Sequence, residues 1–123
     1  MRHFKELKQA ILMDGRIDAQ EVELLQELLY EDGVIDKEEA EFLFELNDEV
    51  IKEDNDLSWD AFFVNAITNF ILDDKKSPGE IDEEEAKWLL LHIQKDGKID
   101  DREKTLLANL KKHSKNFPDI LNL

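Results

Sequence analysis

Apolar residues recur three or four positions apart along most of this chain, and polar residues fill the positions between them. This spacing places the apolar side chains on one face of an α-helix, and no stretch shows the sustained alternation that marks a surface strand. The pattern predicts six helices, over residues 2–13, 19–32, 37–53, 59–73, 83–95 and 101–113. Pro118 predicts the start of a short seventh helix. The expected fold class is therefore all-α, with about seven helices.

The predicted helix 59–73 differs from the others because its apolar residues, among them Trp59, Phe62 and Phe63, point in all directions. A helix that is apolar on every side is buried. We therefore expect this helix at the centre of the fold, with helical hairpins packed around it. Its aromatic residues are typical of a core and not of a ligand pocket. Asp56 or Ser58 is expected to cap its first turn.

A short pattern, Asp-Gly-x-Ile-Asp-x-x-Glu, links the predicted helices in four copies, and in the third copy proline replaces the first aspartate. Its copies begin at Asp14, Asp32, Pro78 and Asp96. The glycines within each pair of copies lie 18 residues apart, and the second pair follows the first by 64 residues. Fixed internal spacing indicates the duplication of a two-motif unit. We expect one domain, 1–123, with two pseudo-symmetric halves of about 1–57 and 58–123, because each half is too small to bury a good core alone.

The duplication extends beyond the motifs. At the offset of 64, Leu25 falls on Leu89 and Leu46 falls on Leu110. Upstream of the motifs the offset is 60, as in the match of Ile11 with Ile71, because the second half carries four additional residues. These matches place whole helices of one half on helices of the other.

Each copy of the motif can act as a device that ends one helix and starts the next. The glycine can adopt the left-handed conformation found after helix ends. The aspartate that follows the isoleucine is expected to accept a hydrogen bond from the first turn of the next helix. The glutamate three residues later is expected to reach back to the amide of that aspartate, which completes a capping box. Each cap contributes on the order of 1 kcal/mol, so capping alone accounts for the recurrence.

The same residues also match the second half of a calcium-binding EF-hand loop, in which the last glutamate binds the ion with both oxygens. The first half of each loop is incomplete: Ala10 and Leu12 occupy the first two ligand positions in the first copy, and the third copy offers only Asp74 there, followed by Lys76. Calcium takes six to eight oxygens, so an EF-hand is disfavoured. Two motifs on antiparallel hairpins can still share one divalent cation: calcium, magnesium, manganese or zinc. The candidate metal ligands are Asp14, Asp18, Glu21, Asp32, Asp36, Glu39, Asp96, Asp100 and Glu103.

His92 lies one turn before Asp96 and is a further candidate ligand through a ring nitrogen. A histidine late in a helix more often interacts with the negative end of the helix dipole. The three serines and three histidines show no Ser/His/Asp catalytic spacing. A glycine-rich loop that could cradle a phosphate is not recognisable either. We therefore expect a protein that is not an enzyme.

The net charge of −15 is concentrated in the first half of the chain. Residues 1–60 hold 19 acids and 6 bases, which gives −13, whereas residues 61–123 hold 12 acids and 10 bases, which gives −2. Such a field opposes binding to nucleic acid and to anionic lipid, and it favours cations or a basic protein partner. A solvated acidic surface is the alternative interpretation. Without cysteine, a signal peptide or a membrane-spanning apolar run, the chain is expected to be cytoplasmic.

The helical hairpins, joined at Asp-Gly turns that Ile-Asp-x-x-Glu follows, resemble the TerB-like family, which includes the tellurite-resistance and DjlA N-terminal helical domains. The resemblance covers roughly residues 4–113 and rests on Asp14-Gly15, Asp32-Gly33, Gly79 and Asp96-Gly97 with the acids that trail them. It implies an all-helical domain with internal symmetry and acidic positions able to bind divalent cations. It also implies a non-catalytic role in stress response or in assemblies at the inner membrane face.

The chain departs from the family pattern at two kinds of position. The family often has alanine before Asp-Gly, where Met13, Glu31 and Lys95 stand here, and Pro78 replaces the first aspartate of the third copy. Metal binding at the third copy is therefore not expected, and tellurite resistance is not carried over. The expected function is that of a small, acidic, non-catalytic module that binds a protein partner, with divalent cations as further ligands. The alternative is a purely structural scaffold whose motif acids serve only as helix caps.

Overall fold

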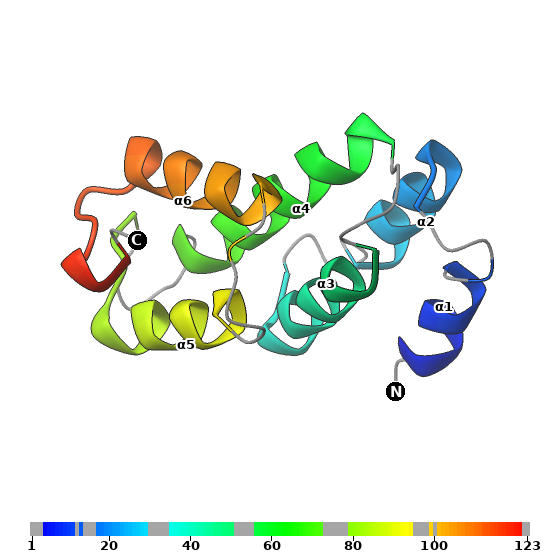
Figure 1. Cartoon of the computed structure of the whole chain (residues 1–123), viewed down its shortest axis with the longest axis horizontal. Helices are drawn as coiled ribbons and strands as arrows, with labels where there is room; N and C mark the ends of the chain where they lie inside the picture. The colour runs from blue at the N-terminus through cyan, green and yellow to red at the C-terminus, as the bar shows by residue number, and fades with distance from the viewer. Residues whose placement is uncertain are drawn as a thin grey trace. The chain divides into compact units, whose positions relative to one another are not determined.

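The computed structural model describes residues 4–11, 13, 17–29, 35–50, 56–72, 79–94, 99 and 101–121. In these residues the chain forms α-helices and no strand, which confirms the predicted all-α class (Figure 1). The helices are α1 (Phe4–Ile11), α2 (Ala19–Leu29), α3 (Lys37–Val50), α4 (Leu57–Leu72), α5 (Glu83–Ile93) and α6 (Asp101–His113). Positions 2–3, 12, 30–32, 51–53, 73 and 95, which the pattern also assigns to helices, lie outside the described residues.

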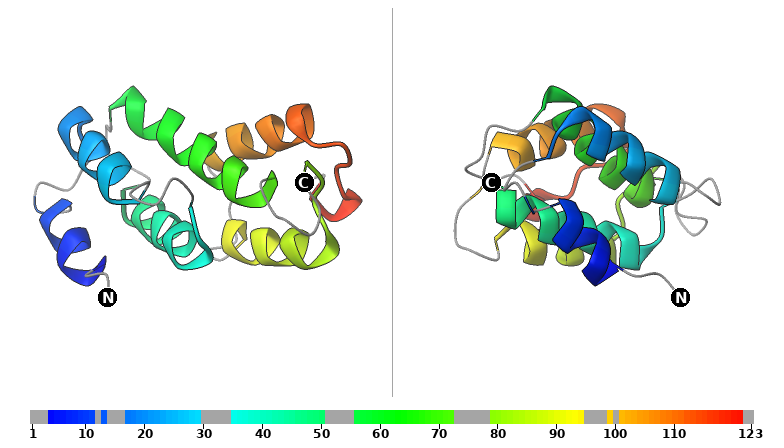
Figure 2. Two further views of the ribbon diagram at one scale, coloured as in Figure 1. Left: turned by 180° about the vertical axis from the view of Figure 1, so that it is seen from behind. Right: turned by 90° about the vertical axis from the view of Figure 1, so that its right-hand side faces the viewer.

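The element predicted at Pro118 is a single 3-10 turn, η2 (Asp119–Leu121), in which the Leu121 amide donates to the Pro118 carbonyl at 3.0 Å. The side chain of Leu121 is buried, and η2 contacts α5. Figure 1 and the left view of Figure 2 show this turn beside the first turn of α5. The end of the described chain therefore contributes to the core next to α5.

The chain separates into two compact units, Met1–Phe63 and Val64–Leu123, and their boundary falls inside α4. In the first unit, the apolar faces of α2 and α3 are buried, and an aromatic cluster joins α3 to α4. The rings of Phe44 and Phe63 meet edge to face with centroids 5.3 Å apart, and Trp59 lies 5.7 Å from Phe63. Edge-to-face pairs of this kind add to the stabilisation that burial provides.

In the second unit, α5 buries Ala86, Leu89 and Ile93, and α6 buries Leu106, Leu107 and Leu110. Both sets recur three or four residues apart, as the sequence pattern requires. The hydroxyl of Thr68 on α4 accepts a hydrogen bond from the side-chain amide of Asn109 on α6, at 2.9 Å. A polar contact therefore joins α4 to α6 inside this unit.

Helix α4 corrects one expectation, because it is not buried on every side. Leu57, Ala61, Asn65 and Asn69 are exposed at intervals of four residues, so they form a single stripe along the helix. The remaining faces are buried or half-buried, and Trp59, Phe63 and Ile67 have no exposed surface. The exposed stripe consists of two asparagines, an alanine and a leucine in the first turn. It therefore leaves only one large apolar side chain of this stripe in contact with water. In the part of the chain that is described, the helices are all too short or too polar to cross a membrane.

Candidate functional site

Three copies of the motif form a complete capping box at the start of a helix. In each copy the glutamate amide donates to the aspartate Oδ1, and the aspartate amide donates back to the glutamate Oε1. The paired distances are 2.8 and 3.0 Å for Asp18 with Glu21, 2.8 and 2.9 Å for Asp36 with Glu39, and 2.7 and 3.0 Å for Asp82 with Glu85. These bonds satisfy two of the amides that a helix N-terminus leaves without partners. In the fourth copy, Asp100 lies outside the described residues.

The motif isoleucines anchor these turns to the core. Ile17, Ile35 and Ile81 are buried, and the residues that follow the glutamates in these copies, Val22, Ala40 and Ala86, are buried as well. This pairing of apolar positions is the arrangement expected of a hydrophobic staple. The fourth copy departs from it, because Ile99 is only half-buried and Lys104 is exposed.

In each unit, backbone groups of one motif isoleucine form hydrogen bonds with a later segment of the chain. This segment follows α3 in the first unit and α6 in the second. The Ile17 carbonyl accepts from the Asp56 amide at 2.9 Å. The Ile81 amide donates to Asn116 Oδ1 at 2.9 Å, and Asn116 Nδ2 donates to the Ile81 carbonyl at 3.0 Å. Buried backbone groups need such partners. In both units, a later segment of the chain supplies them to the motif isoleucine.

Gly79 shows the glycine conformation that the motif predicts. Its φ of +76° lies in the left-handed region, where a side chain would be strained. Its amide donates to the Leu72 carbonyl at 2.8 Å, and its carbonyl accepts from the Lys115 amide at 2.7 Å. The glycine thus joins the end of α4 to the segment after α6. Gly15, Gly33 and Gly97 lie outside the described residues.

The predicted metal ligands are only partly within the described chain. Asp14, Asp32, Asp96 and Asp100 lie outside it. Of the others, Asp18, Glu21, Asp36 and Glu39 each use one carboxylate oxygen in a capping box. In the described ranges, histidine and acidic side chains do not gather in groups of three that could hold a metal ion. The shared cation site therefore stays a prediction, and four of its nine ligands are the aspartates outside the described residues.

Burial separates the motif glutamates into two kinds that the sequence does not distinguish. Glu39 has 0% of its surface exposed and Glu103 has 2%, whereas Glu21 and Glu85 are half-buried. Glu39 and Glu103 are equivalent at the offset of 64, so the second motif of each pair carries the interior glutamate. A carboxylate is buried at acceptable cost only when neighbouring groups bond to it. For Glu39, the capping box supplies one such bond.

A half-buried group of rings, one on α4 and two on α5, is a feature that the sequence analysis did not find. The rings of Phe70, Trp88 and His92 form a chain, with centroids 5.1 Å apart for the first pair and 4.8 Å for the second. Beside it lies an open hollow of about 690 Å³, lined by Lys87, Leu90, Leu91, His92 and Gln94. No sequence signal indicated the hollow, because its residues share only a place on one helix. His92, weighed above as a candidate metal ligand, contacts the ring of Trp88 here.

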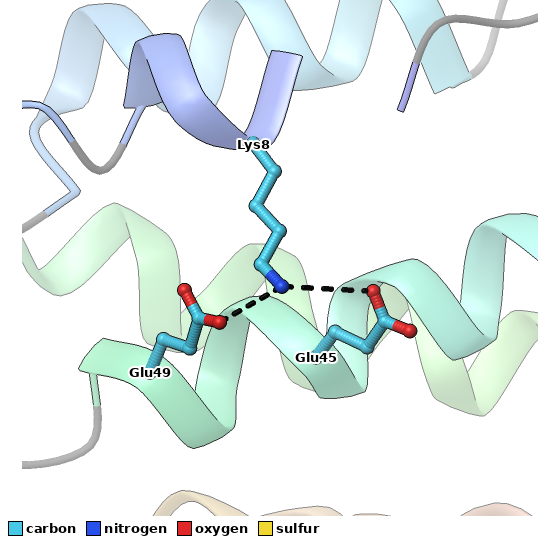
Figure 3. Close-up of polar contacts among 3 residues, drawn as sticks. All are labelled: Lys8, Glu45 and Glu49. Carbon is cyan, nitrogen blue, oxygen red and sulfur yellow. Dashed lines mark ion pairs between the residues drawn. The ribbon is translucent and has the colours of Figure 1, made fainter. Parts of the chain in front are cut away.

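Lys8 ties α1 to α3 in the first unit (Figure 3). Its Nζ lies 2.8 Å from Glu49 Oε1 and 4.0 Å from Glu45 Oε2. The hydrogen bond to Glu49 raises the pKa of Lys8 above its ordinary 10.5, and the two negative charges add to that effect against the opposing influence of burial. At the start of α4, hydrogen bonds from the Ser58 hydroxyl and amide lower the pKa of Asp56, which is the capping role expected there.

The Lys8 contact predicts a stability difference that disappears at high pH. Because the pKa of Lys8 is raised in the folded state, its contribution is complete below 10.5 and is lost as pH rises through the folded value. We expect Lys8→Gln to lower the free energy of unfolding by up to about 1 kcal/mol near neutral pH, since the pair is partly exposed. The gap from wild type should close above the ordinary lysine pKa, in urea titrations repeated across pH.

Lys104→Gln is the matched control, because Lys104 is exposed and forms no ion pair with a described residue. Its unfolding free energy should stay within about 0.5 kcal/mol of wild type at both ends of the pH range. A Lys8→Gln difference that persists unchanged at high pH would show that the side chain stabilises α1 through packing and not through charge.

The comparisons with known proteins leave the geometry as the main guide to function. No protein-family model, no curated protein and no solved structure matches this chain.

Proposed function

We propose that this chain is a non-catalytic, TerB-like helical module that binds a basic protein partner through its first unit and a divalent cation at its motif acids. The observation that carries this proposal is the negative charge of Met1–Phe63, which holds 19 acids and 6 bases and so has a net charge of −13. A field of this sign and size attracts cationic surfaces and repels nucleic-acid phosphate. Location in the cytoplasm and a part in stress response belong to the same proposal.

The internal duplication that this assignment requires is supported by equivalent contacts. Lys8 approaches Glu45 in the first unit, and Thr68 bonds to Asn109 in the second. Lys8 corresponds to Thr68 at the offset of 60, and Glu45 corresponds to Asn109 at the offset of 64. The chemistry of the contact differs, but the same positions of the corresponding helices meet. Equivalent contacts of different chemistry are what divergence of two copies of one helical unit would produce.

A binding experiment tests the proposed partner class. The full chain, immobilised in about 0.15 M salt to screen weak charge contacts, would be exposed to an extract of its own cells, and retained proteins would be cross-linked. We expect a basic partner whose cross-links map to residues 1–63. Cross-links confined to residues 64–123, or retention of no basic protein, would contradict the proposal.

A purely structural scaffold is the second candidate function, and the three capping boxes favour it. There each motif acid serves only to start a helix, and no cation binds. Thermal unfolding of chelator-treated protein with millimolar calcium, magnesium, manganese or zinc separates the candidates. An ion at about 100 times its dissociation constant adds about 2.7 kcal/mol, a shift of roughly 10 °C for a chain of this size.

If the motifs hold a cation, that shift should be specific to one ion and should be lost in Glu21→Gln. Glu38→Gln is the control, because Glu38 is an exposed acid next to a motif glutamate and belongs to no capping box. Its shift should equal that of wild type. Absence of a shift with every ion would leave the acids as caps and would remove cation binding from the proposed function.

A further inference from the structure

Helix α2 carries two leucines on its outer surface. Val22, Leu25 and Leu29 are buried, whereas Leu24 is 41% exposed and Leu28 is 42% exposed. Residues four apart on a helix are neighbours on its surface, so these two side chains form one short apolar ridge. Single exposed leucines are common on protein surfaces; an adjacent pair along one helix edge is a larger apolar feature.

Negative charge borders this ridge. Glu23 and Glu27 immediately precede the two leucines and are themselves one turn apart, so they lie alongside the ridge on the exposed side of the helix. Neither glutamate forms an ion pair or hydrogen bond with any residue that the structure describes. Helix α2 contains no basic residue. The four residues Leu24, Leu28, Glu23 and Glu27, called the α2 ridge below, therefore present apolar surface beside negative charge that is not paired within the described chain.

The second unit fills the corresponding positions with its own aromatic rings. At the offset of 64, Leu24 corresponds to Trp88 and Leu28 to His92, which lie against each other, with Phe70 on the other side of Trp88. Phe70 corresponds to Ala10 at the offset of 60. The side chain of alanine is a single methyl group, which covers far less surface than a phenyl ring. The same helix edge is thus covered by aromatic side chains in one unit and left open in the other. This comparison rests on the internal duplication within the proposed function.

We propose that the α2 ridge is the docking surface of the first unit, and that its occupant is a cationic amphipathic helix of a partner protein. Such a helix repeats apolar residues at the spacing of Leu24 and Leu28, so one of its faces matches the ridge. Lysine or arginine beside that face would pair with Glu23 and Glu27. Charge complementarity selects this partner over an acidic or neutral helix, because the whole first unit is negative.

A labelled synthetic peptide tests the surface. It has about 18 residues, enough to form a helix on binding, with leucines four apart on one face and lysines on both flanks. Its dissociation constant for the full chain would be measured by fluorescence polarisation in about 0.15 M salt. Leu24→Ser with Leu28→Ser is expected to weaken binding about tenfold or more, the loss typical of central apolar contacts. Glu23→Gln with Glu27→Gln is expected to weaken it about threefold or more.

Two controls remove the same chemistry elsewhere. Glu38→Gln with Glu80→Gln deletes two exposed acids that have no partner in the described chain, and Leu57→Ser replaces a leucine that is 83% exposed. Both should bind the peptide within about twofold of wild type, because rim charges and isolated surface residues contribute little. Circular dichroism and urea titration of every variant would verify that the ridge substitutions leave the fold intact.

The outcomes separate this inference from the function on which it rests. If the peptide binds but the ridge variants bind as tightly as the controls, or a scrambled peptide of equal charge binds equally well, the α2 ridge is refuted and the basic partner class survives. If no basic peptide binds and the cross-linking experiment fails as well, both proposals are refuted. Concentration-dependent self-association that the Leu24→Ser, Leu28→Ser variant abolishes would identify a second copy as the occupant and overturn the proposed partner.

Discussion

Replacing Trp59 by alanine is expected to lower the free energy of unfolding by about 3–5 kcal/mol, the range for removal of a large aromatic side chain from a core. Trp59 is fully buried, and its ring lies 5.7 Å from Phe63 and 6.4 Å from Phe62. Removing it would leave a cavity in the aromatic cluster, and the rings of Phe62 and Phe63 would lose their contacts with it. Denaturation by urea, followed by circular dichroism, would measure the change.

Leu57→Ala is the matched control for this substitution, because Leu57 lies two residues earlier on the same helix and is largely exposed. Its unfolding free energy should remain within about 0.5 kcal/mol of wild type. A loss below about 1 kcal/mol for Trp59→Ala would mean that the cluster tolerates the cavity, and that α4 does not organise the core of the first unit as its burial indicates.

Replacing Ile81 by alanine is expected to cost about 2–5 kcal/mol, because the side chain is buried and its removal leaves a cavity. The effect tests what the recurrent motif contributes apart from any ligand. The capping bonds of Asp82 and Glu85 use backbone and carboxylate groups that the substitution leaves in place. The expected loss should therefore be the same in chelator and in each divalent cation, as urea titrations under those conditions would record.

Leu91→Ala serves as the control for Ile81→Ala, since Leu91 is an exposed residue of the adjoining helix α5. Alanine is the best helix former, so this change should alter stability by no more than about 0.5 kcal/mol. An Ile81→Ala loss that grew when a cation was present would show that the isoleucine supports a metal site, and the staple interpretation would be wrong.

Helix positions were predictable because they depend on local chemistry. The period of the apolar residues gives the buried face of each helix, and the capping residues give its first turn. Asp18, Asp36 and Asp82 each precede the first residue of a helix in the structure, as the motif predicts. These signals operate within four residues of the chain, so a single sequence contains them in full.

Features that depend on which helix faces meet were not predictable in this way. The burial of Glu39 and Glu103, the ring contacts of Trp88 with Phe70 and His92, and the exposed stripe of α4 all result from tertiary packing. The same limit applies to the cation site. Spacing placed acids at helix starts, but whether acids of different hairpins converge depends on packing, and four of the nine proposed ligands lie outside the described residues.

The contact of α1 with α3 in the first unit and that of α4 with α6 in the second differ in chemistry. The two contacts therefore respond differently to ionic strength. Lys8 holds α1 to α3 through charge, whereas Thr68 and Asn109 join α4 to α6 through neutral groups. Dissolved ions screen the first contact and leave the second largely unaffected. Helix α1 has only eight residues, too few to persist in water without tertiary support. Rising ionic strength should therefore favour local detachment of α1, so amide protons there should exchange faster while those of α6 keep their protection.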